Sequence, residues 1–137
     1  AGSSYNGLGY IYVKQEKIEL AINCYLKALA SYRNLENHEK QLELLVGIGL
    51  NYRKLEQWEK TLEFCIQALD AAKYLENRKE EVQLRVDLAE TYCNLGKREF
   101  AESQLRLVEE SLKIIPEPLS ALLQRRVDKL RTSQNLF

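Results

Sequence analysis

The sequence predicts an all-α solenoid built from consecutive helical hairpins, and three observations predict it. Equivalent residues recur every 40 positions, as at Leu8, Ile48 and Leu88. The helix-favouring residues Leu, Glu, Lys, Arg and Ala dominate, whereas the 137 residues include only two prolines and six glycines. Apolar residues recur at spacings of three and four, which is the period of a helix with one buried face. A repeat of this kind indicates the overall architecture more strongly than any local sequence pattern.

The repeat unit is defined by columns of equivalent residues. Two helices approach closely only where side chains are short, so we expect the small column that begins at Gly9 to face the small column that begins at Ala21. The tyrosine column is expected to fill the wider gap one turn further along. The aligned positions are Leu8/Ile48/Leu88, Gly9/Gly49/Ala89, Tyr12/Tyr52/Tyr92, Ala21/Thr61/Ala101, Ala28/Ala68/Val108 and Leu35/Leu75/Ile115.

These columns resemble the tetratricopeptide repeat, whose signature is Leu-Gly, then Tyr, then Ala, then Ala-Leu. Thr61 and Cys65 are departures, the third copy drifts after Ala101, and the closing proline of the family is missing from the first two linkers. A period of 40 rather than 34 residues is similar to the repeats of kinesin light chains, of Leu-Gly-Asn-rich spindle-orientation adaptors and of the Rap-type regulators of bacteria. The resemblance implies a right-handed superhelical solenoid of three hairpins with a C-terminal capping helix.

The chain is predicted to be a single domain over residues 1–137, with repeats at about 3–36, 38–76 and 78–115. Helices are expected over residues 4–14 and 17–35, then 38–55 and 57–75, then 78–95 and 97–115. Asn37 is predicted to cap the third helix, and Asn77 with Glu80 forms a predicted capping box for the fifth. Residues 1–4 are small and polar, which is typical of an expression-tag remnant before an excised fragment.

The last part of the chain departs from the repeat. Proline cannot continue a helix, so Pro116-Glu117-Pro118 predicts a break. An amphipathic capping helix is predicted over residues 118–132, and residues 133–137 are predicted to be loose. The capping helix lacks the small packing column, so we expect no further hairpin to dock on it in the same way.

The charge, hydropathy and cysteine patterns exclude several classes of function. Twenty basic residues balance twenty acidic ones, which gives no support for a nucleic acid partner. No apolar run reaches the length of about 18 residues that a membrane span needs, so no membrane partner is predicted. The three cysteines are scattered, without a Cys-x-x-Cys pair, which favours reduced thiols and a cytoplasmic location.

Residues able to carry catalysis are almost missing. His38 is expected to be a solvated residue at a helix start, without a nucleophile or metal ligand at a recognisable spacing. The thiols are expected to be core groups, with Cys93 the most accessible. Gly47-Ile48-Gly49 lies inside a predicted helix and is not a phosphate loop. We therefore predict no enzyme activity, no cofactor and no metal site.

The informative surface is the predicted concave face, which the first helix of each hairpin lines. Tyr10, Val46, Leu50 and Val86 form an apolar floor where polar residues would be expected on a solvated face, and such a floor usually indicates a partner. Alternatively, the preceding helix covers part of this stripe. The predicted groove residues are Asn6, Tyr10, Lys14, Val46, Gly47, Leu50, Arg53, Lys54, Val86, Asp87, Glu90 and Asn94.

The resemblance also bears on the kind of ligand. The carboxylate clamp of the family needs polar or basic groups where this chain has Val46, Gly47 and Val86, so a chaperone-tail clamp is not expected. The groove instead suits an amphipathic protein segment that carries a few charges. The predicted function is a protein-interaction module, acting as an adaptor or scaffold. Two alternatives stay open: self-assembly through the uncovered first hairpin at Tyr5 and Leu8, and a peptide-responsive regulatory domain.

Overall fold

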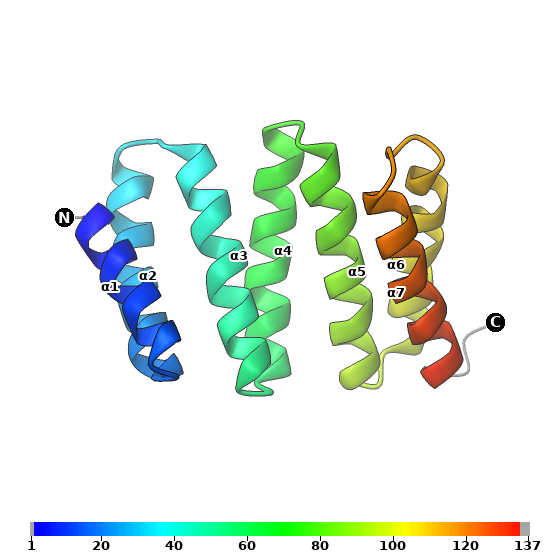
Figure 1. The fold of residues 1–137 in the computed structure, drawn as a ribbon, viewed down its shortest axis with the longest axis horizontal. Coiled ribbons are helices and arrows are strands. Elements are labelled where there is room, and N and C mark those ends of the chain that lie inside the picture. The colour runs from blue at the N-terminus through cyan, green and yellow to red at the C-terminus, as the bar shows by residue number, and fades with distance from the viewer. Residues whose placement is uncertain (1, 135–137) are drawn as a thin grey trace. The chain divides into compact units, whose positions relative to one another are not determined.

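The computed structural model describes residues 2–134, and within that range the chain forms seven α-helices and no strand (Figure 1). The predicted fold class, an all-α solenoid of three hairpins and a C-terminal helix, is confirmed. The predicted helix ends agree to within three residues. The helices are α1 (Gly2–Lys14), α2 (Ile18–Asn34), α3 (His38–Lys54), α4 (Trp58–Tyr74), α5 (Arg78–Asn94), α6 (Arg98–Leu112) and α7 (Leu119–Gln134).

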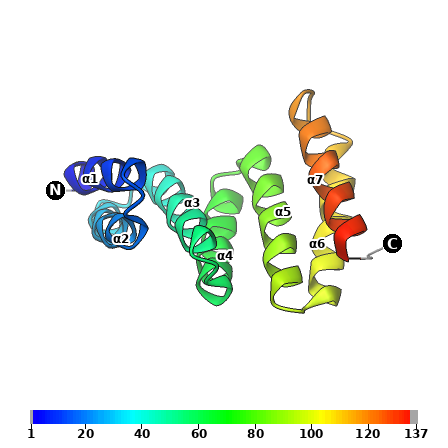
Figure 2. The ribbon, with the colours of Figure 1, turned by 60° about the horizontal axis from the view of Figure 1, so that its bottom comes forward.

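The helices group into two compact units, Ala1–Glu76 and Asn77–Phe137. In the first unit, α1 packs on α2, α2 on α3 and α3 on α4. In the second unit, α5 packs on α6, and α7 packs on both of them (Figure 2). The boundary between the units coincides with the predicted boundary between repeats two and three. The assignment of all 137 residues to one domain stays a prediction.

The structure differs from two predictions about the ends of the chain. Residues 2–4 belong to α1, although the helix was predicted to begin at residue 4. Ser133 and Gln134 were predicted to be loose, but they form the end of α7. The rest of that predicted loose tail, residues 135–137, lies outside the described residues.

Each of the five turns that connect α1 to α6 contains a residue in the left-handed backbone conformation. These residues are Glu16, Glu36, Glu56 and Glu76, with φ between 54° and 60°, and Gly96, with φ of 74°. They are spaced by 20 residues, so one helix with its turn is half of the 40-residue repeat. After α2, the Glu36 N–H donates to the Arg33 carbonyl and the Asn37 N–H to the Tyr32 carbonyl. This is the Schellman arrangement, which ends a helix sharply without the proline that the family uses.

Replacing Glu36 by glycine is expected to stabilise the chain by about 1 kcal/mol. A side chain with a Cβ atom pays a steric cost of this order in the left-handed conformation, and glycine does not. The matched reverse change is Gly96→Ala, which is expected to destabilise by about the same amount. Urea denaturation of the parent and both variants measures the differences. A less stable Glu36→Gly variant would contradict the role of the left-handed residue.

The predicted N-caps at Asn37 and Asn77 are confirmed, and the capping box with the Glu80 side chain stays a prediction. The Asn37 side-chain oxygen accepts a hydrogen bond of 3.1 Å from the Lys40 N–H, and the Asn77 oxygen accepts one of 3.1 Å from the Glu80 N–H. Each asparagine is thus the last residue of the turn that ends one helix and also the N-cap residue of the next helix. This double role explains how linkers of three residues join antiparallel helices.

The small column faces different residues from those predicted. A Cβ atom added at Gly9 would lie 2.9 Å from Cε1 of Tyr25, and one added at Gly49 would lie 3.6 Å from Sγ of Cys65. Tyr25 and Cys65 follow Ala21 and Thr61 by four residues. The prediction that the small columns face one another is therefore wrong by one helical turn. Gly9 makes room for an aromatic ring rather than for a second small residue.

The second unit has its own core, to which α5, α6 and α7 all contribute. Val82, Val86, Ala89 and Cys93 of α5 belong to it, with Leu105 and Val108 of α6 and Leu123 and Val127 of α7. Cys93 is only 8% exposed, as is Cys24, so the prediction that Cys93 is the most accessible thiol is wrong. Burial raises the pKa of the Cys93 thiol, which keeps it protonated and unreactive.

Candidate partner-binding face

Eight of the predicted groove residues lie in the first unit. Tyr10 is 58% exposed and Leu50 is 42% exposed, which is unusual for side chains of this size. Lys14 and Lys54 are also exposed, and the remaining four are partly buried. We call this set the α1–α3 face, and its members are Asn6, Tyr10 and Lys14 of α1 and Val46, Gly47, Leu50, Arg53 and Lys54 of α3.

Tyr25 of α2 packs against Gly9 of α1, the helix that carries Tyr10. Burial raises the pKa of its phenol, and the nearby charges of Glu43 in α3 and Tyr10 in α1 raise it further. The ring occupies the space that Gly9 leaves open. The contact of Tyr25 with Gly9 was not predicted from the sequence.

The α1 part of the face is held together by a cation–π contact. The Lys14 ammonium lies 5.3 Å from the centre of the Tyr10 ring. The two residues are four positions apart on one helix, which places them on the same side. An exposed contact of this kind contributes about 0.5–1 kcal/mol. It keeps a positive charge beside an aromatic surface.

The α3 part of the face contains open space. A Cβ atom added at Gly47 would meet nothing within 4 Å. The side chain of Asn51, which is 4% exposed, donates a hydrogen bond of 2.9 Å to the Gly47 carbonyl. Glycine in a helix interior costs about 1 kcal/mol relative to alanine. The gap that Gly47 leaves between Val46 and Leu50 is therefore retained at a cost in stability.

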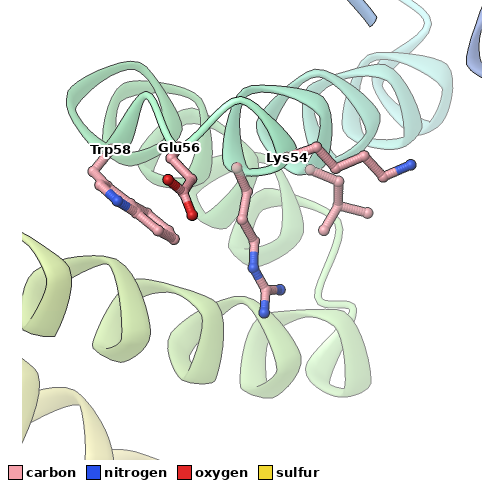
Figure 3. A pocket seen from close by; sticks show the side chains of 5 residues that line it. Lys54, Glu56 and Trp58 are labelled. Carbon is pink, nitrogen blue, oxygen red and sulfur yellow. The ribbon is translucent and has the colours of Figure 1, made fainter. Parts of the chain in front are cut away.

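A pocket of about 420 Å³ opens at the C-terminal end of α3. Its lining residues are Leu50, Arg53, Lys54, Glu56 and Trp58. Figure 3 shows Glu56 and Trp58 at one end of the pocket and Lys54 at the other. Two cationic side chains, one carboxylate and an apolar wall suit an apolar side chain with acidic neighbours.

Sequence analysis predicted three residues of this pocket and missed two, Glu56 and Trp58. Trp58 is the first residue of α4, and Glu56 lies in the turn between α3 and α4. The available signals were that Trp58 is the only tryptophan and that Glu56 is part of a turn motif that recurs every 20 residues. Neither signal indicates a pocket unless the geometry of the turn between α3 and α4 is known.

The predicted groove residues of repeat three are in a different situation. Val86 is fully buried in the core of the second unit, so it is not available to a ligand, contrary to the prediction. The reason is that α7 packs on α5. An Arg126 nitrogen in α7 lies 2.7 Å from Oδ1 of Asp87 and 3.6 Å from Oε2 of Glu90. Asn94 is exposed, and its side chain donates to the Glu90 carbonyl.

The other residues considered for chemistry form no recognisable site. His38 is exposed, and its ring centre lies 4.6 Å from that of Tyr74. Over residues 2–134, no group of three or more His, Cys, Asp or Glu side chains is placed to hold a metal ion. Within the same residues, every helix is too short or too polar to cross a bilayer.

A sequence model of the tetratricopeptide repeat family matches residues 1–60. No curated protein matches the sequence. Three solved structures with similar folds are the apo form of RapI, BtubC (BKLC) from P. vanneervenii and the N-terminal domain of stress-induced protein-1 (STI-1) from C. elegans.

RapI matches with a TM-score of 0.85 over 98% of this chain, BtubC with 0.75 over 99%, and the STI-1 domain with 0.72 over 96%. Their sequence identities are 15%, 13% and 17%, so the likeness concerns the fold alone. The chain spans 38% of the RapI chain, 65% of the BtubC chain and 94% of the STI-1 domain. Together with the 40-residue repeat, these matches show a helical repeat fold like that of the tetratricopeptide type, whose sequence model covers residues 1–60 of the 137.

Proposed function

We propose that the chain binds a segment of a partner protein on the α1–α3 face. The observation that carries the proposal is the exposure of Leu50 on α3, the helix that also has open space at Gly47 and a pocket at its end, together with the exposure of Tyr10 on α1. Large apolar side chains gathered on one face are typical of an interaction site. Folds of the tetratricopeptide type generally mediate protein–protein interactions, which supports the same conclusion.

The two units differ in a way that favours the first as the binding site. The position equivalent to Leu50 in repeat three is Glu90, whose carboxylate pairs with Arg126. Val86, the equivalent of Val46, is buried where α7 packs on α5. The second unit therefore covers with its own helix the positions that the first unit leaves exposed.

The charge of the face indicates the chemistry of the segment. Lys14, Arg53 and Lys54 are its members that are charged at neutral pH, and all three are basic. A complementary segment carries acidic residues next to an apolar side chain that enters the pocket of Leu50 and Trp58. Charge pairs at the rim would set the association rate and the partner choice, whereas the apolar contact would supply the affinity. The segment is thus amphipathic, bound as a helix or as an extended chain.

Replacing Leu50 by glutamate is expected to lower the affinity for such a segment at least tenfold, on the order of 1.4 kcal/mol. The new carboxylate would be desolvated without a partner where an apolar side chain should bind. Ile66→Glu is the matched control, because Ile66 is 41% exposed against 42% for Leu50 but lies on α4, outside the α1–α3 face. Both variants should keep the melting temperature of the parent.

The measurement uses peptides selected from a displayed random library on the immobilised chain, followed by titration of the purified peptides. Selected peptides should be acidic and amphipathic, and Arg53→Glu should weaken their binding and reduce its dependence on salt. Equal affinities for the Leu50→Glu and Ile66→Glu variants would exclude the α1–α3 face. If Leu50→Glu unfolds the chain instead, Leu50 belongs to the core.

The proposed place of action is a reducing, cytoplasm-like compartment, where the chain would serve as an adaptor or scaffold. Cys24 and Cys93 are buried thiols, which supports this proposal because buried thiols persist most readily where no oxidant acts on them.

A further inference from the structure

Helix α7 packs on the first helix of the hairpin that precedes it. In the first unit, α3 also follows a hairpin, and it packs on α2, the second helix of that hairpin. In the second unit, α7 packs on α5 as well as on α6 (Figure 2). It covers Val86, a residue of the predicted groove. The second unit thus already holds a helix on the groove positions of α5.

The side of α7 that packs on this hairpin is apolar and presents Arg126 to α5. Leu123 and Val127 are 2% and 0% exposed, and they belong to the core of the second unit. Arg126 follows Leu123 by three residues, which places it on the same side of the helix. Its guanidinium lies 2.7 Å from Oδ1 of Asp87 and 3.6 Å from Oε2 of Glu90. These positions of α5 therefore accept an amphipathic helix whose charge is opposite to theirs.

We propose that the segment bound on the α1–α3 face is a helix, docked on α3 as α7 is docked on α5. This inference rests on the proposed function and commits to one of the two conformations that the proposed function leaves open. A helix satisfies its backbone hydrogen bonds internally, so a surface of apolar and basic side chains suffices to hold it. An extended segment needs backbone partners, which a sheet edge usually provides, and residues 2–134 form no strand.

The differences between α3 and α5 define the side chains of the bound helix. The equivalent positions are Val46 and Val86, Gly47 and Asp87, and Leu50 and Glu90. Where α5 has two acids, α3 has a glycine and a leucine, so the ligand residue that corresponds to Arg126 is large and apolar. A Cβ atom at Gly47 would meet nothing within 4 Å, which gives room to that side chain.

The basic residues of the face determine where the bound helix carries its acids. Lys14 lies in the last turn of α1, and Arg53 and Lys54 lie in the last turn of α3. Helices α5 and α7 run in the same direction (Figure 1), so a ligand that docks like α7 runs in the direction of α3. Its carboxylates therefore lie in its C-terminal half, opposite these three side chains.

A charge exchange tests the docking. The probes are the peptides selected on the parent chain whose affinity falls with Leu50→Glu. Each apolar residue of a probe is replaced singly by arginine, and each variant is titrated against the parent and against the Leu50→Glu chain. One arginine position should restore the affinity for Leu50→Glu to within about threefold of the parent pair, because it recreates the pair of Arg126 and Glu90. The same arginine should weaken binding to the parent at least tenfold.

The control chain for this exchange is Ile66→Glu, which should bind the unchanged probes like the parent and gain nothing from the selective arginine. Restoration at no position would overturn the proposal. Equal restoration at every position would reveal general charge attraction and would overturn it as well.

A second experiment distinguishes a helix from an extended segment. Proline is placed in the middle of a probe, at a residue where alanine leaves the affinity unchanged, and it should lower the affinity at least tenfold because it breaks a helix. A lactam between residues i and i+4 on the solvent side should raise the affinity, because it preorganises the helix. A probe that is sensitive to Leu50→Glu but tolerates proline would disprove the helix and leave the proposed function standing. If no selected peptide is sensitive to Leu50→Glu, the proposed function fails, and the helical ligand fails with it.

Discussion

Replacing Gly49 by leucine is expected to lower the free energy of unfolding by about 3 kcal/mol, at the upper end of the usual cost of overpacking. Gly49 is buried where α3 packs on α4. A Cβ atom at this position would already lie 3.6 Å from Sγ of Cys65 and 3.9 Å from Cβ of Phe64. Three further carbon atoms have no space there, so α3 and α4 would have to separate. The first unit should loosen as a whole because α3 also packs on α2.

The control for this prediction is Gly49→Ala. Its single added carbon makes ordinary van der Waals contacts with Cys65 and Phe64, and alanine favours a helix interior by about 1 kcal/mol over glycine. This variant should therefore match or exceed the stability of the parent in urea denaturation. Ala121→Leu in α7, where the site is only half-buried, should cost less than Gly49→Leu. If Gly49→Leu melts at the temperature of the parent, Gly49 does not lie in the contact between α3 and α4.

Replacing Arg131 by alanine is expected to destabilise the chain by about 2 kcal/mol, because two partly buried carboxylates would lose their partner. Arg131 of α7 donates a hydrogen bond of 2.7 Å to Glu102 of α6 and a second one to Glu109. Its side chain is 15% exposed, against 23% for Glu102 and 40% for Glu109. The partial exposure of the acids reduces the expected cost below that of a fully buried pair. Differential scanning calorimetry measures the loss.

A control variant distinguishes the effect of the ion pairs of Arg131 from the effect of an exposed ion pair. Arg106 also pairs with Glu102, at 3.2 Å, but its side chain is 77% exposed. Exposed pairs contribute about 0–1 kcal/mol, so Arg106→Ala should have little effect. Equal losses of stability for Arg106→Ala and Arg131→Ala would show that the packing of α7 does not depend on the ion pairs that Arg131 makes with Glu102 and Glu109.

The pH dependence follows from the pKa of Glu102. Burial acts to raise this pKa, but the hydrogen bonds from Arg131 and Arg106 outweigh burial, and the pKa falls below its ordinary value of 4.5. A group with a lowered folded-state pKa stabilises the fold above its unfolded pKa, and this contribution disappears as the pH falls through the folded pKa. The stability difference between the parent and Arg131→Ala should therefore be largest near neutral pH and shrink below about pH 4.5.

The fold was largely predictable because its signals are local and repeated. Helix periodicity, the 40-residue spacing and the caps at Asn37 and Asn77 all depend on residues close to one another in the chain. The left-handed glutamates were not predicted, since Glu36 or Glu56 carries no preference for that conformation by itself. The hydrogen bonds of the turn hold them there, and the chain tolerates the cost because each turn must reverse direction within three residues.

The site was predictable only in part. Tyr10 and Leu50 are exposed on the α1–α3 face as the helix period requires, and three of the five residues that line the pocket were anticipated. Val86 has the same helix position as Val46, yet the two differ in burial. Position in the repeat therefore does not determine exposure.

By itself, the sequence determined the class of the fold, the number of hairpins and the side of each helix on which a residue lies, because these follow from the period of the helix and of the repeat. The tertiary structure alone decided which of those sides is covered. Packing of α7 on α5 buries Val86 and pairs Asp87 with Arg126, whereas Val46 at the equivalent position of α3 is only partly buried. Burial depends on the neighbours that distant parts of the chain provide, and a local pattern does not contain that information.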